Sequence, residues 1–378
     1  MTDLAAPVVG LGEATHGSRE FVGLRARLTH AICARGARAV ALEAGAGSVV
    51  PLDRWVTRGE GRLADALADL PRFWRTERFG TFCRRLREVN RATDEPVRVY
   101  GVDVDDPGVL AGVLRERLES FTGSPVSTLD ALADDRGSLA GRVLDERIDR
   151  AERAVAAVRD RLPDEERVED RDRAATRDVR LARYCTDALD RTVEWLRAGG
   201  ATGEFEPTAM GDRDRVMAAN TARLADRGVV YWAHAVHVQR GTFDNRTAWA
   251  DQRTAGDHLA DRLGGDYRAV GTDFAVGGFR AGTPDADWTT TRLTESLPGS
   301  VADRLAETTD VGAAVFDPRG AADDPRVPDA ALPDRLRAVG LHYDPDGDPQ
   351  VVEADLAAAF DRVIAFDAVS PTRPLDSA

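Results

Sequence analysis

The pattern of hydrophobic positions in the first hundred residues alternates between short apolar runs and amphipathic stretches. Apolar runs typical of buried strands occupy residues 8–12, 39–42 and 97–102. Apolar residues recur at helical spacing over residues 18–36 and 63–91, between these runs. Because strand–helix alternation is typical of parallel sheets covered by helices, the sequence predicts an α/β fold with a mostly parallel sheet flanked by helices.

The pattern changes at residue 107, and residues 107–226 carry only helical periodicity among dense charges. Strand patterns return later in the chain, at residues 229–233, 267–271, 311–316 and 363–366. We therefore predict a core domain formed by residues 1–106 and 227–378, with residues 107–226 as a large helical insertion or cap. Such an insertion is expected to cover a site and to limit the size of its substrate.

The composition is that of a globular protein with an acidic surface. The chain has 378 residues, of which 43% are hydrophobic and 31% charged, enough for one large domain or two smaller ones. All of its 51 basic residues are arginine, and 65 acidic residues give a net charge of −14. Such a surface repels phosphate backbones, so nucleic acid is not an expected partner. The acidic bias indicates a halophilic protein from a salt-rich cytoplasm, where ions screen charge repulsion; a GC-rich genome gives a compatible explanation.

Cysteine usage and apolar stretches define the expected compartment. Cys33, Cys83 and Cys185 are far apart and form no C-x-x-C motif, which argues against a disulfide framework and a cysteine zinc site. Residues 1–7 lack the features of a signal peptide, and no apolar stretch approaches 18 residues. We therefore expect a cytoplasmic protein with no membrane partner, and the sequence predicts no particular oligomeric state.

Ionisable residues follow four predicted strands at their carboxyl ends: Glu13, Glu43, Asp103 and His234. His16 and His237 each come three residues after one of these positions, so three of the six histidines belong to this set. In open parallel sheets, ligands bind outside the carboxyl ends of the strands. We therefore expect these side chains to form one polar cluster at that edge.

Each of these residues also has a structural interpretation when it is taken alone. A glutamate such as Glu13 or Glu43 at a strand end serves equally well as a helix cap or an ion-pair partner. A lone histidine is usually a core or surface residue, and we interpret His30, His258 and His342 in this way. The chain has no G-x-S-x-G, H-E-x-x-H, P-loop or G-x-G-x-x-G motif, which argues against several familiar active sites. The joint pattern is what favours a functional site.

The same residues lie in motifs that resemble the erythromycin esterase-like family. Residues 12–21 (GEATHGSREF) resemble its first motif, Glu43 matches the carboxylate of its second, and Arg25 falls where the family has an arginine. Residues 232–238 (WAHAVHV) resemble its W-A-H-N-x-H element, although Ala235 replaces the asparagine and removes its hydrogen-bonding side chain. Weaker matches occur at residues 213–220 (RDRVMAAN) and 274–281 (FAVGGFRA).

This resemblance implies hydrolysis of an ester or lactone in a small molecule, and a role in the response to an antibiotic, without establishing a macrolide as the substrate. No cofactor is predicted, and a divalent metal is kept as an alternative. The residues predicted to be catalytic are His16, Glu43, Glu13, His234 and His237. The residues predicted to bind substrate are Arg25, Arg213 and Asp103.

The predicted mechanism uses His16 as a general base, because a histidine with an ordinary pKa near 6.5 is neutral and basic at working pH. Glu13 or Glu43 would orient its ring and stabilise the imidazolium. His234, His237 and Arg25 would donate hydrogen bonds to the developing oxyanion. Arg25 has an alternative interpretation as the ion-pair partner of Glu43 or Glu13.

Two alternatives use the same cluster differently. The histidines and glutamates could bind zinc, manganese or iron, and the divalent metal would then generate the nucleophile. We favour a metal-free site because two histidines three residues apart after a strand are not a diagnostic ligand motif. The second alternative is a non-catalytic small-molecule-binding protein on the same scaffold, which the replacement at Ala235 favours.

Overall fold

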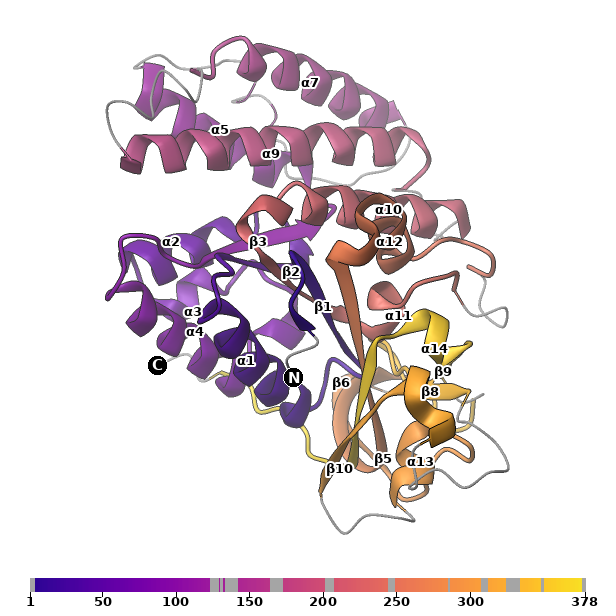
Figure 1. Cartoon of the computed structure of the whole chain (residues 1–378). Helices are drawn as coiled ribbons and strands as arrows, with labels where there is room; N and C mark the ends of the chain where they lie inside the picture. Colours follow the sequence, from indigo (N-terminus) through magenta and orange to yellow (C-terminus); the bar gives the residue numbers. More distant parts are fainter. Residues whose placement is uncertain are drawn as a thin grey trace.

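The computed structural model describes residues 4–122, 129, 132, 142–163, 173–200, 207–243, 249–284, 286–306, 312–323, 334–347 and 350–375. Its centre is an eight-stranded sheet in the order β3-β2-β4-β1-β5-β10-β7, with β6 paired to β5 (Figure 1). Neighbouring strands are parallel except where β6 pairs with β5 and β7 pairs with β10. The prediction of a mostly parallel α/β fold is confirmed.

The strands of the sheet are β1 (Val8–Glu13), β2 (Ala39–Gly45), β3 (Arg98–Asp103), β4 (Val229–His234), β5 (Tyr267–Thr283), β6 (Ala286–Leu293), β7 (Ala313–Phe316) and β10 (Arg362–Val369). Strands β8 (Arg335–Arg337) and β9 (Val351–Glu353) form a separate antiparallel pair. The adjacent strands β1 and β4 are in register through Glu13 and His234. Because β1 to β4 run parallel, their carboxyl ends meet at one edge of the sheet.

One face of the sheet is covered by the helices α1 (Arg19–Cys33), α2 (Val50–Arg58), α3 (Leu63–Ala66) and α4 (Glu77–Asn90). Buried side chains of β2 and β4 such as Leu42 and Trp232 pack against apolar residues of these helices. The indole nitrogen of Trp232 also donates a hydrogen bond to the Thr29 hydroxyl at 2.8 Å, so α1 is fixed against the centre of the sheet. Apolar burial on this face is the main stabilising contribution of the layer.

The opposite face is covered by α5 (Pro107–Thr122), α9 (Arg173–Arg197), α10 (Pro207–Ala222) and α12 (Ala255–Leu263), and α7 (Arg142–Arg159) packs against α5 and α9 farther from the strands. Their buried apolar residues form one continuous core with the strands, and α7 and α9 lie side by side above β3 in Figure 1. The Tyr184 hydroxyl of α9 donates to the carbonyl oxygen of Gly101 at 2.6 Å. The described residues of 107–226 are therefore mainly helical and pack on a face of the sheet, and α10 also reaches its carboxyl edge.

The helical stretch predicted for residues 63–91 is helical in the structure but divided into three pieces, α3, the short 3-10 helix η2 (Arg72–Trp74) and α4. Pro71 lies in the break, where its ring and missing amide hydrogen are incompatible with a helix interior. The break turns Phe73 and Trp74 inward, and both are buried. This irregular segment therefore places two aromatic side chains beside the strand ends.

The remaining short helices are η3 (Ala225–Arg227), α11 (Ala235–Val238), η4 (Gly264–Asp266), α13 (Val301–Ala306), η5 (Pro318–Asp323) and α14 (Leu356–Ala359). Residues 370–375, here called the C-terminal strap, run across two earlier segments. The Thr372 amide donates to the carbonyl oxygen of Gly17 at 2.8 Å, and Pro374 forms a bridge with Thr76. Within the described ranges, no helix is both long enough and apolar enough to cross a membrane.

Candidate active site

The carboxyl ends of β1 to β4 bring the predicted site residues into one buried cluster. The five residues predicted to be catalytic are each 5% exposed or less. The ring centroids of His16 and His234 lie 5.1 Å apart, and the backbone amide of His234 donates to Oε2 of Glu43 at 2.8 Å. The residues that follow the first strand and those that follow the fourth therefore face the same site.

Glu13 connects His16 to Arg25. Its Oε1 atom lies 2.9 Å from Nδ1 of His16, and its Oε2 atom lies 2.5 Å from Nη2 of Arg25. The Arg25 guanidinium stacks between the indoles of Trp232 and Trp74, at 4.7 Å and 5.3 Å from their centroids. Burial lowers the pKa of Arg25, and the Glu13 carboxylate opposes this effect. Of the two interpretations of Arg25, the structure has the ion pair, and its partner is Glu13.

The two ring nitrogens of His16 differ in their hydrogen-bond partners. Nδ1 faces Glu13, which fixes the tautomer that carries its proton there. The ring stacks on Phe73 with centroids 4.2 Å apart and planes inclined by 21°. No side chain or backbone group in the described ranges forms a hydrogen bond with Nε2. This nitrogen is therefore the atom of His16 that can accept a proton from water.

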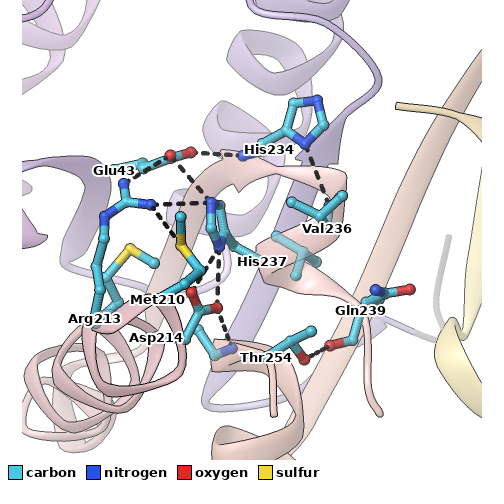
Figure 2. Close-up of polar contacts among 12 residues, drawn as sticks. Glu43, Met210, Arg213, Asp214, His234, Val236, His237, Gln239 and Thr254 are labelled. Carbon is cyan, nitrogen blue, oxygen red and sulfur yellow. Dashed lines mark hydrogen bonds and ion pairs between the residues drawn. The ribbon is translucent and has the colours of Figure 1, made fainter. Parts of the chain in front are cut away.

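Glu43, Arg213 and Asp103 form an ion-pair network at the ends of β2 and β3. Figure 2 shows the contact between Arg213 and Glu43. Arg213 of α10 donates from Nε and Nη2 to the two oxygens of Asp103, at 2.9 Å and 2.5 Å, and from Nη2 to Oε1 of Glu43 at 3.1 Å. Burial alone would raise the pKa of Glu43, but His237, His16 and Arg213 outweigh it and hold that pKa well below its usual range. Asp103 and Glu43 likewise raise the pKa of Arg213 against the effect of its burial.

His237 lies between two carboxylates. Its Nδ1 atom is 3.0 Å from both oxygens of Asp214, and its Nε2 atom is 3.4 Å from Oε1 of Glu43 (Figure 2). Burial would lower the pKa of His237, but Asp214 and Glu43 raise it to about 10. With His237 protonated, this part of the site has two cations, Arg213 and His237, against the three carboxylates of Asp103, Glu43 and Asp214, so one negative charge is left uncompensated.

Asp214 was missed by the sequence reasoning. It is fully buried, and its Oδ1 atom also accepts a hydrogen bond from the Ala255 amide at 2.6 Å. Its only sequence signal is its place directly after Arg213 in the RDRVMAAN segment, among charged residues that resemble a solvated helix face. In the structure this carboxylate fixes the orientation of His237.

His234 differs from the other two histidines because the backbone occupies both of its ring nitrogens. Nε2–H donates to the carbonyl oxygen of Val339 at 3.1 Å, and Nδ1 accepts from the Val236 amide at 3.4 Å. Burial, together with the neighbouring His16, lowers the pKa of His234 to about 3, so the ring is neutral. Figure 2 shows this ring directed away from Glu43 while its backbone amide faces Glu43. This geometry favours a positioning role for His234 over donation to a substrate.

Three carboxylates of the cluster are already paired with guanidinium groups. Glu13 pairs with Arg25, and Glu43 and Asp103 pair with Arg213. Among the residues that the structure describes, no group of three or more histidine, cysteine or acidic side chains is arranged to hold a metal ion. Chemically, the arrangement offers one histidine with an available basic nitrogen beside a buried imidazolium and an arginine.

Comparison with known proteins gives a family match for most of the chain. A family model described as erythromycin esterase matches residues 32–369. The matched range includes Glu43, Arg213, His234 and His237, but it begins after His16. No curated protein matches the chain.

Three solved structures resemble the chain. A protein from Bacillus cereus has a TM-score of 0.77 at 19% identity, over 98% of this chain and 90% of the other. A succinoglycan biosynthesis protein has a TM-score of 0.73 at 17% identity, over 99% and 91% of the two chains. A mutant of the erythromycin esterase EreC in its open conformation has a TM-score of 0.65 at 18% identity, over 98% and 93%. At these identities the likeness shows a shared fold.

Proposed function

Because the chain belongs to the erythromycin esterase family, we propose that it hydrolyses an ester or lactone bond in a small molecule, using water activated by His16. The observation that carries this proposal is the asymmetry of the His16 ring. Glu13 binds its Nδ1 side, and the described residues leave Nε2 without a hydrogen bond. This is the arrangement that a general base requires.

In the proposed reaction, Nε2 of His16 takes a proton from water as the water oxygen attacks the substrate carbonyl carbon. Glu13 stabilises the resulting imidazolium through Nδ1–H, as the carboxylate of a catalytic triad does. The protonated His16 then returns the proton to the departing alkoxide when the tetrahedral intermediate collapses. The products are a carboxylic acid and an alcohol, and a lactone opens to a hydroxy acid.

The developing negative charge on the carbonyl oxygen requires donors that are already oriented. We assign this role to His237 and Arg213, which are both cationic and both contact Oε1 of Glu43. Glu43, Asp103 and Asp214 fix these two cations in place through the contacts described above. His234 contributes by holding Glu43 with its backbone amide.

His16→Ala tests this proposal. General acid–base catalysis contributes about 10² to 10⁴ in rate, so the variant should lose hydrolysis by at least about a hundredfold with little change in melting temperature. The assay is hydrolysis of a panel of simple esters, lactones and macrolides, because a macrolactone substrate would connect the protein with the response to an antibiotic. His258→Ala is the matched control, since His258 lies on α12 and takes no part in the hydrogen bonds of the site described above.

Two outcomes would contradict the proposal. Activity of His16→Ala within about tenfold of the unaltered protein would exclude His16 as the base. Saturable binding of panel compounds without turnover by the unaltered protein would support the small-molecule-binding alternative.

A further inference from the structure

A cavity outside the cluster described above lies between the start of α1, the β5–β6 hairpin and the C-terminal strap. Its volume is about 430 Å³. It is lined by Arg19, Arg280, Thr290, Ser370, Pro371, Thr372, Arg373 and Pro374. Three of these residues are arginine and none is acidic, in a chain whose acidic residues outnumber its basic ones by 65 to 51. The local charge is therefore opposite to the net charge of the protein.

Backbone pairing brings these side chains together from segments far apart in the sequence. Arg280 on β5 is the register partner of Thr290 on β6, so the two side chains share one face of the hairpin. The Arg19 amide donates to the carbonyl oxygen of Ser370 at 3.0 Å, and Ser18 forms a bridge with Pro371. Hydrogen-bonded backbone therefore supports the walls of the cavity.

The positive charge of the cavity is only partly compensated within the protein. Glu20 pairs with Arg19 at 3.1 Å, and its other oxygen accepts from the Ser370 amide at 2.7 Å. Arg280 donates to the carbonyl oxygen of Trp288 at 3.0 Å, which leaves its charge unneutralised. In the part of the chain that the structure describes, no carboxylate pairs with Arg280 or Arg373. Two guanidinium groups therefore lack a counter-charge.

We propose that this cavity binds a small molecule through a phosphate group. Guanidinium groups bind phosphate oxygens with paired, charge-assisted hydrogen bonds. A phosphate group carries up to two negative charges, which matches the two uncompensated arginines, and the nearby hydroxyls of Thr290, Ser370 and Thr372 are further donors. The cavity volume lies within the usual range for small-molecule sites.

The cavity is connected to the candidate base through one residue. The carbonyl oxygen of Gly17, the residue after His16, accepts from the amides of Arg280 and Thr372 at 3.2 Å and 2.8 Å. A Cβ atom at Gly17 would lie 2.0 Å from the carbonyl oxygen of Arg280, so only glycine fits this approach. A ligand that bridges Arg280 and Arg373 would therefore brace the hairpin and the strap against the His16 loop.

The C-terminal strap also contacts the segment that follows Phe73, on which the His16 ring stacks. The carbonyl oxygen of Arg373 accepts from the Glu77 amide at 3.0 Å, and the Leu375 amide donates to the carbonyl oxygen of Arg75. Residues 75–77 directly follow Phe73 and Trp74, on which the His16 ring and the Arg25 guanidinium stack. Ligand binding in the cavity is therefore expected to stabilise the two segments that position His16, which are the backbone at Gly17 and the segment that carries Phe73.

Calorimetric titration of the full chain with pyrophosphate tests the binding proposal. The unaltered protein should bind pyrophosphate saturably, and the double variant Arg280→Gln/Arg373→Gln should bind it at least about tenfold more weakly. The double variant Arg27→Gln/Arg35→Gln is the matched control, because it removes the same charge from exposed positions in and just beyond α1. Absence of saturable binding by the unaltered protein, or equal weakening in both double variants, would overturn the proposal.

Hydrogen exchange tests the connection to the His16 loop. Bound pyrophosphate should slow amide exchange in peptides that contain Thr372 and Arg280, whose amides hold Gly17. Unchanged exchange at saturating pyrophosphate would refute this connection. Neither measurement depends on hydrolysis, so their failure is distinguishable from a failure of the proposed activity.

Discussion

Replacement of Asp214 by asparagine separates the charge of this side chain from its shape. The amide oxygen of the introduced asparagine can still accept a hydrogen bond from the Ala255 amide, as Oδ1 of Asp214 does at 2.6 Å. The amide nitrogen would then face Nδ1 of His237, where the carboxylate now lies at 3.0 Å. Because an amide NH₂ donates and carries no charge, it no longer favours an imidazolium at that position.

The expected effect follows from Coulomb's law. Opposite charges about 4 Å apart interact by about 4 kcal/mol at an effective dielectric constant of about 20. Loss of that interaction should weaken proton binding by His237 by about a thousandfold. The pKa of His237, which Asp214 and Glu43 raise to about 10 against the effect of burial, should then fall toward that of a free histidine. The imidazolium would give way to neutral imidazole near neutral pH.

An NMR titration of the ring resonances in histidine-labelled protein measures this change without a substrate. The His237 resonance should titrate near neutral pH in Asp214→Asn and stay unshifted to about pH 9 in the unaltered protein, in which the pKa of His237 is about 10. Asp212→Asn is the control, because it removes the same charge from the same helix at a position that is 31% exposed. A His237 resonance that titrates alike in Asp214→Asn and the unaltered protein would refute the assignment of Asp214 as the residue that keeps His237 charged.

Two further predictions concern pH and metal ions. The free energy of unfolding should fall as the pH drops from about 6.5 toward 3, because the pKa of His234 is about 3 in the folded protein and near 6.5 in the unfolded chain. The free energy of unfolding should also fall as the pH rises from about 6.5 toward 10, because the pKa of His237 is higher in the folded protein than in the unfolded chain. Urea titrations across this pH range measure both decreases. His234→Gln should reduce the decrease at acid pH. Hydrolysis should survive dialysis against a chelator, because guanidinium groups already pair with Glu13, Glu43 and Asp103; loss of activity that zinc or manganese restores would favour the metal-dependent alternative.

The elements predicted correctly are those whose buried positions are apolar in the sequence. The strands β1 to β4 are almost entirely buried, so each forms a largely apolar run in the sequence. Strand β6 was missed because it is polar and partly exposed, and it pairs only with the far end of β5. The break at Pro71 was missed because helical periodicity continues on both sides of it. The break matters for the site, since it supplies the aromatic ring of Phe73, on which His16 stacks.

The location of the cluster followed from the topology, because parallel strands deliver their final residues to one edge. The partners of each side chain did not follow from the sequence. Asp214 and Asp212 are two residues apart on α10 and of the same residue type, yet one is fully buried against His237 while the other forms an exposed ion pair with Arg215. Helix orientation decides between them, and it depends on packing between α10, β3 and α12.

Three histidines in this cluster illustrate why residue type alone does not define a role. His16 has a carboxylate on one nitrogen and no described hydrogen-bond partner on the other, His234 has backbone groups on both, and His237 lies between two carboxylates. Because hydrogen bonding and neighbouring charge set the protonation of an imidazole, these surroundings give a potential base, a fixed neutral ring and a buried cation. A water-activating base and a charged electrophile can therefore be the same residue type within one site, provided that their neighbours separate their proton affinities. Asp214 is the residue that creates this separation, which is why its neutralisation should affect His237 while leaving the Glu13–His16 pair intact.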